Sequence, residues 1–226
     1  MTGYGQYCPV AKAAEVFAER WTPLVIRNLY LGCRSFGEIL EGVPRMSRAL
    51  LTKRLHELER CGVVARVPSP RGRGSHYSLT QAGHELAEVC LALGTWGARW
   101  LEVAPEDSDP FVVLWGWKKF VRRDELPLKR VVVRFDLRDR PKERYWLLLD
   151  RQGVELCVKP PDLDEDLVVT TDSETLMQVH MGRLSLEEAM RQNRWIIDGT
   201  PELIRAFPRW GGLSYYAGVR SAQAAS

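Results

Sequence analysis

The hydrophobic period of the chain changes at Gly62, and no other feature of the sequence restricts the fold as much. From Ser47 to about Arg60, leucines recur at helical spacing, and a serine stands where an N-cap is expected. Beyond Gly62, residues 63–67 and 76–79 form the pattern of two short strands around a turn rich in proline, glycine and arginine. The sequence therefore predicts a helix followed directly by a two-stranded hairpin with a basic tip.

Helical patterns also lie on both sides of this segment. Apolar positions predict a helix over 10–17 and a second one with Thr22 as its N-cap. A short third helix begins with a capping box formed by Ser35 and Glu38, and Thr80 caps a long helix that follows the hairpin. Together with the segment around Gly62, these helices predict a winged helix-turn-helix domain.

Positive charge is concentrated in the same region. The whole chain has 32 basic and 29 acidic side chains, a net charge of +3, but residues 43–76 hold eight basic and two acidic ones. If Leu51, Leu55 and Leu58 are buried, a rotation of 100° per residue turns the other side chains of this helix outward. A basic face on a helix and a hairpin is typical of a phosphate-binding surface. The predicted contacts to double-stranded DNA are Arg45, Ser47, Arg48, Thr52, Lys53, Arg54, His56, Arg71 and Arg73.

The members of this set have different predicted roles. Arg48 is the predicted base reader, because the two parallel donors of a guanidinium match O6 and N7 of guanine. Arg71 and Arg73 lie in the hairpin turn, from which they can follow phosphates or enter the minor groove. For each arginine alone the alternative is a solvated surface charge, but their joint placement on helix and hairpin favours DNA.

The sequence divides at an acidic, proline-bounded stretch from Ala104 to Pro110. Beyond it, residues 131–138 alternate as a half-buried strand, and further strands and capped helices follow. Strands with segregated helices predict an α+β domain with an antiparallel sheet and helices on one side. The predicted organisation is α+β in two domains: a winged helix-turn-helix at 1–104, a linker at 105–109, an α+β domain at 110–220 and a disordered tail at 221–226.

Five short motifs stand in order along the first half: Cys8-Pro9, Arg20–Leu24, Phe36–Ile39, Leu51–Glu59 and Tyr77–Gly83. In this order they resemble the HxlR-type bacterial transcriptional regulators, over about residues 7–102. The resemblance implies a cytoplasmic homodimer whose interface uses the helices at 9–19 and 81–102. Trp96 and Trp100 are then anchors of that interface or part of the domain's own core.

Some members of that family sense oxidants or electrophiles through the cysteine that Cys8 matches. Cys8 precedes a helix, and a helix N-terminus lowers the pKa of a thiol and so raises its reactivity. The five cysteines are scattered and odd in number, which predicts free thiols instead of a disulfide framework. A redox-sensing regulator acting through Cys8 is therefore one alternative function.

Three stretches of the second half, Asp166–Asp172, Gly182–Ala189 and Ile196–Leu203, more weakly resemble sterol-carrier-protein-like domains. Such domains enclose an apolar tunnel, so the resemblance implies that this half senses a small apolar ligand. The side chains expected to line its pocket are Trp115, Phe135, Trp146, Met177 and Trp195. The alternative for these residues is ordinary core packing, and a lipid-type carrier with secondary DNA binding is the other alternative function.

Patterns of known catalytic sites are missing from the sequence. The four histidines stand apart from other ligands at metal spacing, and the chain has no phosphate-binding loop, dinucleotide fingerprint or serine-nucleophile motif. We therefore expect no catalytic residues, no metal and no cofactor. The longest uncharged stretch, Met1–Ala11, is shorter than the ~20 apolar residues of a membrane span and lacks the order of a signal peptide. This predicts a cytoplasmic protein without a membrane partner.

Overall fold

A computed structural model describes residues 3–69, 74–104 and 107–222. The chain forms two compact units, Met1–Gly97 and Ala98–Ser226, which are described separately below. The predicted α+β class with two domains is confirmed. The division between the units precedes the predicted linker at 105–109, of which residues 105–106 lie outside the described residues.

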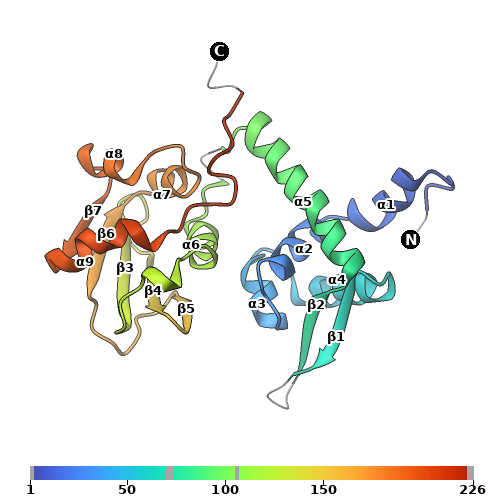
Figure 1. The fold of residues 1–226 in the computed structure, drawn as a ribbon, viewed down its shortest axis with the longest axis horizontal. Coiled ribbons are helices and arrows are strands. Elements are labelled where there is room, and N and C mark those ends of the chain that lie inside the picture. The colour runs from blue at the N-terminus through green and yellow to red at the C-terminus, as the bar shows by residue number, and fades with distance from the viewer. Residues whose placement is uncertain (1–2, 70–73, 105–106, 223–226) are drawn as a thin grey trace. The chain divides into compact units, whose positions relative to one another are not determined.

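The first unit consists of helices and one hairpin (Figure 1). Its elements are α1 (Pro9–Phe17), α2 (Thr22–Tyr30), α3 (Phe36–Glu41), α4 (Arg48–Arg60), β1 (Val64–Pro68), β2 (Ser75–Leu79) and α5 (Gln81–Trp100). The two strands pair antiparallel, from Val64 opposite Leu79 to Pro68 opposite Ser75. The hairpin projects beyond the helices in Figure 1, and the predicted winged helix-turn-helix is confirmed.

Capping side chains define most of these helix ends, as the sequence predicts. The backbone N–H of Glu38 donates to Ser35 Oγ (3.2 Å), and the N–H of Ser35 donates to the Glu38 carboxylate (2.9 Å). Ser47 Oγ caps α4, and Thr80 Oγ1 accepts a hydrogen bond at the start of α5. These bonds satisfy donors that a helix N-terminus otherwise leaves unpaired.

The start of α2 differs from the prediction, because Trp21 and not Thr22 is the N-cap. The first intrahelical bond runs from the N–H of Val25 to the carbonyl of Trp21 (3.0 Å), and the acceptor of that bond defines the cap. Trp21 adopts a left-handed backbone conformation (φ 77°). Thr22 is then the first helical residue, and its side chain is fully buried.

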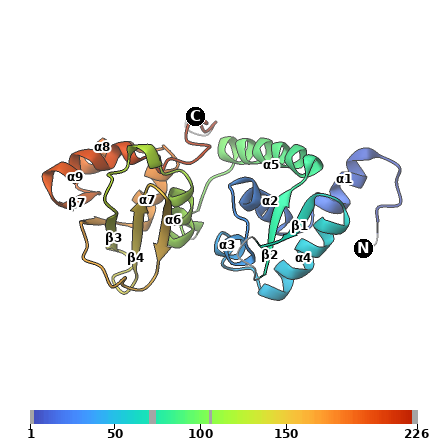
Figure 2. The same ribbon diagram turned by 60° about the horizontal axis from the view of Figure 1, so that its bottom comes forward.

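The second unit is a five-stranded sheet with helices (Figure 2). Its elements are α6 (Pro110–Lys119), η2 (Arg123–Glu125), β3 (Val131–Leu137), β4 (Arg144–Asp150), β5 (Gly153–Cys157), β6 (Leu167–Thr171), α7 (Ser173–His180), α8 (Leu186–Arg191), β7 (Ile196–Gly199), α9 (Pro201–Ala206) and η3 (Phe207–Trp210). The strand order is β5-β4-β3-β6-β7. Val131, Val133 and Phe135 alternate onto one face, where side chains of the helices pack against them in the core. The predicted placement of helices on one side of the sheet is thus confirmed.

One strand pair departs from the predicted antiparallel sheet: β3 and β6 run parallel. Because β5 also points in the direction of β6, the chain must cross the sheet between them, through residues 158–166. Glu165 in this crossover accepts a hydrogen bond from Trp146 Nε1 (2.9 Å), and Asp166 accepts one from the N–H of Val132 (2.9 Å). The crossover therefore covers the face of the sheet opposite the helices.

Candidate nucleic-acid interface and ligand cavities

Helix α4 has one buried and one exposed face. Leu51, Leu55 and Leu58 are between 0% and 2% exposed. The exposed residues of the helix are Arg48, Ala49, Thr52, Lys53, His56 and Arg60. The predicted orientation of this helix is confirmed, and its polar side chains are free to reach a large ligand.

Arg48, at the first turn of α4, is oriented by a neighbouring helix. Its guanidinium carbon lies 5.0 Å from the ring centroid of Phe36 in α3, within the range of a cation–π contact. Thr52 Oγ1 donates to the carbonyl of Arg48 (3.0 Å), which leaves the hydroxyl oxygen as an acceptor. The supporting role of Phe36 has no signal in the sequence, because it depends on how two helices pack.

Arg54 differs from the other predicted DNA contacts because it is buried, with a side chain only 7% exposed. Its two terminal nitrogens donate to Glu19 (3.0 Å) and Glu57 (2.6 Å). Breaking both ion pairs to reach a phosphate would leave two carboxylates unpaired. We therefore leave Arg54 out of the proposed contact set and assign it to the packing of α4 against the segment that follows α1.

The remaining predicted DNA contacts belong either to α4 and the residues before it or to the hairpin. Arg45, Ser47, Lys53 and His56 are exposed around α4, although the Ser47 hydroxyl is already engaged as the helix cap (3.2 Å). Arg71 and Arg73 lie outside the described residues. In the described part of the hairpin, the exposed Arg66 donates through Nε to Ser75 Oγ (2.8 Å) and so links β1 to β2.

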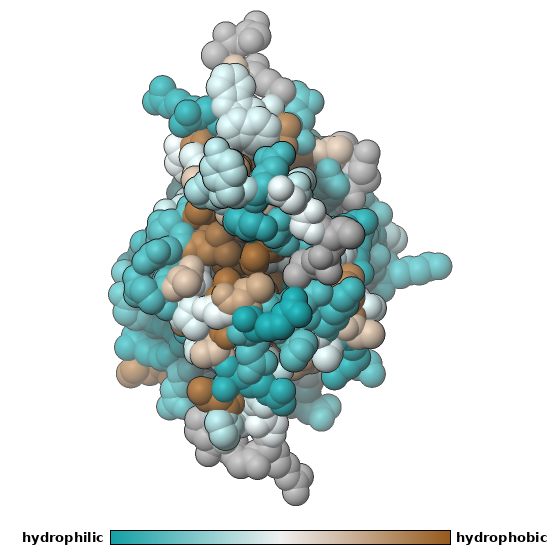
Figure 3. All heavy atoms as spheres, turned by 90° about the vertical axis from the view of Figure 1, so that its right-hand side faces the viewer, coloured by the Kyte–Doolittle hydropathy of each residue, from teal (hydrophilic) through white to brown (hydrophobic). Residues whose placement is uncertain are grey.

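Helix α5 presents an apolar stripe to solvent. Val89, Leu93, Trp96 and Trp100 follow one another at intervals of four, three and four residues, and each is between 48% and 54% exposed. Trp96 and Trp100 therefore do not belong to the core of the unit. Helix α1 likewise has no buried residue among its nine. Figure 3 views the molecule from the side on which α1 lies in Figure 1 and shows apolar surface between polar side chains.

All five cysteines are free. Cys8 is half-buried at the N-cap of α1, where its carbonyl accepts from the N–H of Lys12 (3.0 Å). Cys90 is a contrasting case, because its burial in α5 raises the pKa of its thiol to about 11. A thiol with that pKa remains protonated at neutral pH.

Aromatic rings form the centre of the second unit. Five rings pack against one another at centroid distances of 5.5–6.4 Å along the pairs that link them: Trp117, Phe135, Trp195, Phe207 and Trp210. Two of the predicted ligand contacts, Phe135 and Trp195, are thus neighbours within the packed core. Aromatic pairs at these distances add to the stability that burial provides.

The other predicted ligand contacts lie elsewhere. Met177 in α7 packs against the same core, whereas Trp146 projects from the opposite face of the sheet beside Val132 and Leu148. Trp115 in α6 is 2% exposed, with Lys119 Nζ 5.5 Å from its ring centroid. The structure therefore does not bring all five predicted residues around one cavity.

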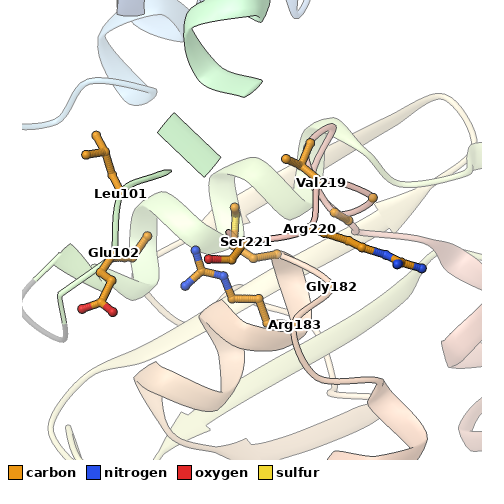
Figure 4. A pocket seen from close by; sticks show the side chains of 11 residues that line it. Leu101, Glu102, Gly182, Arg183, Val219, Arg220 and Ser221 are labelled. Atoms are coloured by element: carbon orange, nitrogen blue, oxygen red, sulfur yellow. The ribbon is translucent and has the colours of Figure 1, made fainter. Parts of the chain in front are cut away.

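Two cavities of the second unit have other linings. The first, of about 260 Å³, lies beside Trp117 and is bounded by the end of α7, the turn into α8 and the glycine pair Gly211–Gly212. The second, of about 760 Å³, is bounded by residues 101–103, 181–183 and 217–221. In Figure 4 its Arg183 side chain lies between Glu102 and Ser221, while Arg220 points away from them. No local sequence pattern identifies either cavity, because the residues that line each one come from segments far apart in the chain.

Metal and membrane sites are not evident in the part of the chain that the structure describes. These residues contain no group of three or more His, Cys, Asp or Glu side chains able to hold a metal ion. Their helices include none that is long and apolar enough to cross a membrane.

Two protein families match this chain. Residues 16–105 match the HxlR-like helix-turn-helix family, and residues 124–209 match the SCP-2 sterol transfer family. An uncharacterised HTH-type transcriptional regulator of Synechocystis is 35% identical over 99 residues, which cover 43% of this chain and 73% of the relative. The HTH-type regulator YvaP of Bacillus subtilis is 35% identical over 100 residues, which cover 43% of this chain and 92% of YvaP.

A solved structure is also similar over part of this chain. The reduced form of the transcriptional regulator YodB from B. subtilis is 33% identical, with a TM-score of 0.36, over 41% of this chain and 92% of that one. The HxlR-like match begins near the end of α1 and covers α2 to α5 with the hairpin, and the second match covers the sheet and the helices α7 to α9. The chain belongs to the HxlR-like helix-turn-helix family of transcriptional regulators and carries an SCP-2-like domain after the winged helix.

Proposed function

We propose that this regulator binds operator DNA as a homodimer, with α4 in the major groove and the wing along the backbone, and that its second unit senses a small apolar ligand. The observation that carries the DNA-binding part is the exposed face of α4. There Arg48, Thr52 and Lys53 are accessible while the leucines of the same helix are buried. These side chains supply the donors and acceptors that base edges and phosphates require.

The exposed stripe of α5 supports the homodimer. Four large apolar side chains at alternating spacings of four and three residues form the seam that a second helix of the same kind can cover. Helix α1, without a buried residue, adds a further surface. A two-fold dimer presents two recognition helices, so its operator is a pseudo-palindrome with half-sites about one helical turn, or 34–36 Å, apart.

Footprinting of the full-length protein on selected DNA tests this proposal. The expected result is protection of two inverted half-sites with centres about 10 base pairs apart. Protection of one asymmetric half-site by a monomer contradicts the dimer. Absence of any sequence preference at physiological salt contradicts the assignment of α4, because phosphate contacts alone give binding without sequence discrimination.

A further inference from the structure

We infer that the cavity beside Trp117 binds an uncharged apolar molecule of about the size of two fused rings, and that it excludes a sterol. This inference rests on the proposed sensing role of the second unit, to which it adds a site and a ligand class. The SCP-2 match covers most of the cavity wall but does not by itself identify what the cavity holds.

The lining of the cavity is mainly apolar. The side chains that supply apolar surface are Trp117, Val179, Leu184, Leu186, Pro208 and Leu213. Its charged lining residues, Arg122 and Glu187, have opposite signs, and the Ser185 hydroxyl already accepts from the N–H of Glu188 (3.1 Å). A lining without net charge favours a neutral ligand, since an ion would lose hydration without a matching partner.

One wall of the cavity is held rigidly. Gly211 and Gly212 have φ values of +90° and +96°, and a Cβ on Gly212 would lie 1.9 Å from Trp117 Nε1. Only glycine permits this conformation and this close approach of the backbone to the indole ring. His180 fastens the same wall, because its Nδ1 donates to the Gly212 carbonyl (2.5 Å) and its own carbonyl accepts from the N–H of Ser214 (2.7 Å).

The cavity volume sets the size of the ligand. An apolar cavity of about 150 Å³ holds one benzene molecule, and pockets that enclose drug-sized ligands measure about 300–1,000 Å³. At about 260 Å³ this cavity lies between the two, which suits a bicyclic aromatic molecule. A sterol, with four fused rings and a side chain, belongs to the larger class. Outward movement of the wall at Gly212 is restricted, because His180 holds Gly212 and Ser214 by two hydrogen bonds.

Calorimetric titration of the full-length protein with indole, naphthalene and cholesterol tests the inference. We expect saturable binding of the two bicyclic molecules and none of cholesterol. Leu184→Trp, which fills the cavity, should weaken binding of both bicyclic probes at least ten-fold. The matched control is Leu163→Trp, because Leu163 is 47% exposed in the crossover and does not line the cavity.

A second variant keeps the test decisive if Leu184→Trp does not fold. Leu184→Ala enlarges the cavity and should admit a three-ring aromatic such as acridine, which the unmodified protein binds at least ten-fold more weakly. Bicyclic binding that neither Leu184 variant alters, or cholesterol binding that competes with indole, overturns the inference.

Operator binding by the same preparations separates this inference from the proposed DNA function. Intact operator binding without probe binding refutes the cavity inference and leaves the DNA-binding proposal standing. Probe binding with unchanged operator affinity supports the cavity and refutes the sensing role.

Discussion

At the scale of single residues, two arginines of one helix differ in burial. The exposed one is available to DNA, and the buried one stabilises the fold. Arg48 and Arg54 lie six positions apart in α4, yet Arg48 is exposed over Phe36 and Arg54 is enclosed by Glu19 and Glu57. The prediction from the sequence assigned both to DNA. The accessible guanidinium can exchange its present contact for a base edge, whereas the buried one cannot leave its partners without a large cost.

Arg48→Ala and Arg54→Ala should therefore change different properties: the first DNA binding, the second the stability of the fold. Arg48→Ala is expected to weaken operator binding by about 1–3 kcal/mol and to relax selectivity at one base position, with little change in melting temperature. Arg54→Ala should lower the free energy of unfolding by about 2 kcal/mol and leave the preferred sequence unchanged. Mobility shifts on operator variants and thermal melts distinguish them. An Arg48→Ala protein with normal affinity and selectivity contradicts the role of α4.

His180 makes the stability of the second unit depend on pH. Burial lowers the pKa of its imidazole below 6.5 in the folded state, so the unfolded chain binds the proton more readily. The stability that the neutral ring contributes is present above about pH 6.5 and is lost as pH falls through the lowered pKa. Melting temperature should fall between pH 7 and pH 5, and His180→Asn should reduce this slope. Thermal melts of the unmodified protein and of His180→Asn over this pH range measure the difference.

At the scale of elements, α5 combines two faces with different roles. Gly83, Ala87 and Cys90 are buried against the first unit, while the stripe from Val89 to Trp100 is exposed. A helix that stabilises its own unit with one face retains the other face for a partner. Exposed apolar stripes of this length are uncommon on monomers and mark contact surfaces.

Trp96→Asp should convert the proposed dimer into a monomer. A carboxylate in the middle of the seam loses hydration in both subunits, and we expect the dissociation constant of the dimer to rise at least ten-fold. Sedimentation velocity measures the change directly. His84→Asp, on the flank of α5 away from the stripe, is the matched control and should remain dimeric. If Trp96→Asp and the unmodified protein sediment alike, the α5 interface is wrong.

We expect the hairpin to contribute affinity for DNA and α4 to contribute sequence selectivity. Replacement of Arg71 and Arg73 together by alanine should weaken binding to all sequences equally, because phosphate contacts carry no base information. Each lost phosphate contact should reduce the slope of log affinity against log salt by about 0.9. Titrations at several salt concentrations on operator and unrelated DNA check both expectations. Loss of affinity for the operator alone would assign these arginines to base recognition.

At the scale of the whole molecule, the chain combines a DNA-binding unit and an SCP-2-like unit in one polypeptide. A ligand of the second unit changes operator affinity only if it binds the DNA-competent and the free conformations with different affinity. We expect indole at saturation to change operator affinity by a few-fold to about a hundred-fold, and to raise the melting temperature of the protein. Parallel mobility shifts and thermal melts with Leu184→Trp, in which neither change should occur, test this coupling.

The sequence alone determined the elements and their order. Caps such as Ser35, Ser47 and Thr80 and the change of period at Gly62 act over a few residues, so their effect can be derived without a fold. The leucine face of α4 followed from helical geometry in the same way. The order of motifs was sufficient to indicate both families.

Only the tertiary structure decided what depends on residues far apart in the chain. Three features join segments that are distant in the chain. They are the parallel pairing of β3 with β6, the ion pair that buries Arg54 beside Glu19, and the cavity between Trp117 and the Gly211–Gly212 turn. The resemblance to sterol-carrier domains predicted a ligand site lined largely by aromatic residues, but Phe135 and Trp195 pack into the core and Trp146 lies on the opposite face of the sheet. The local sequence pattern around an apolar residue is the same whether the residue lies in a core or lines a pocket. The packing of the whole unit determines where a cavity remains.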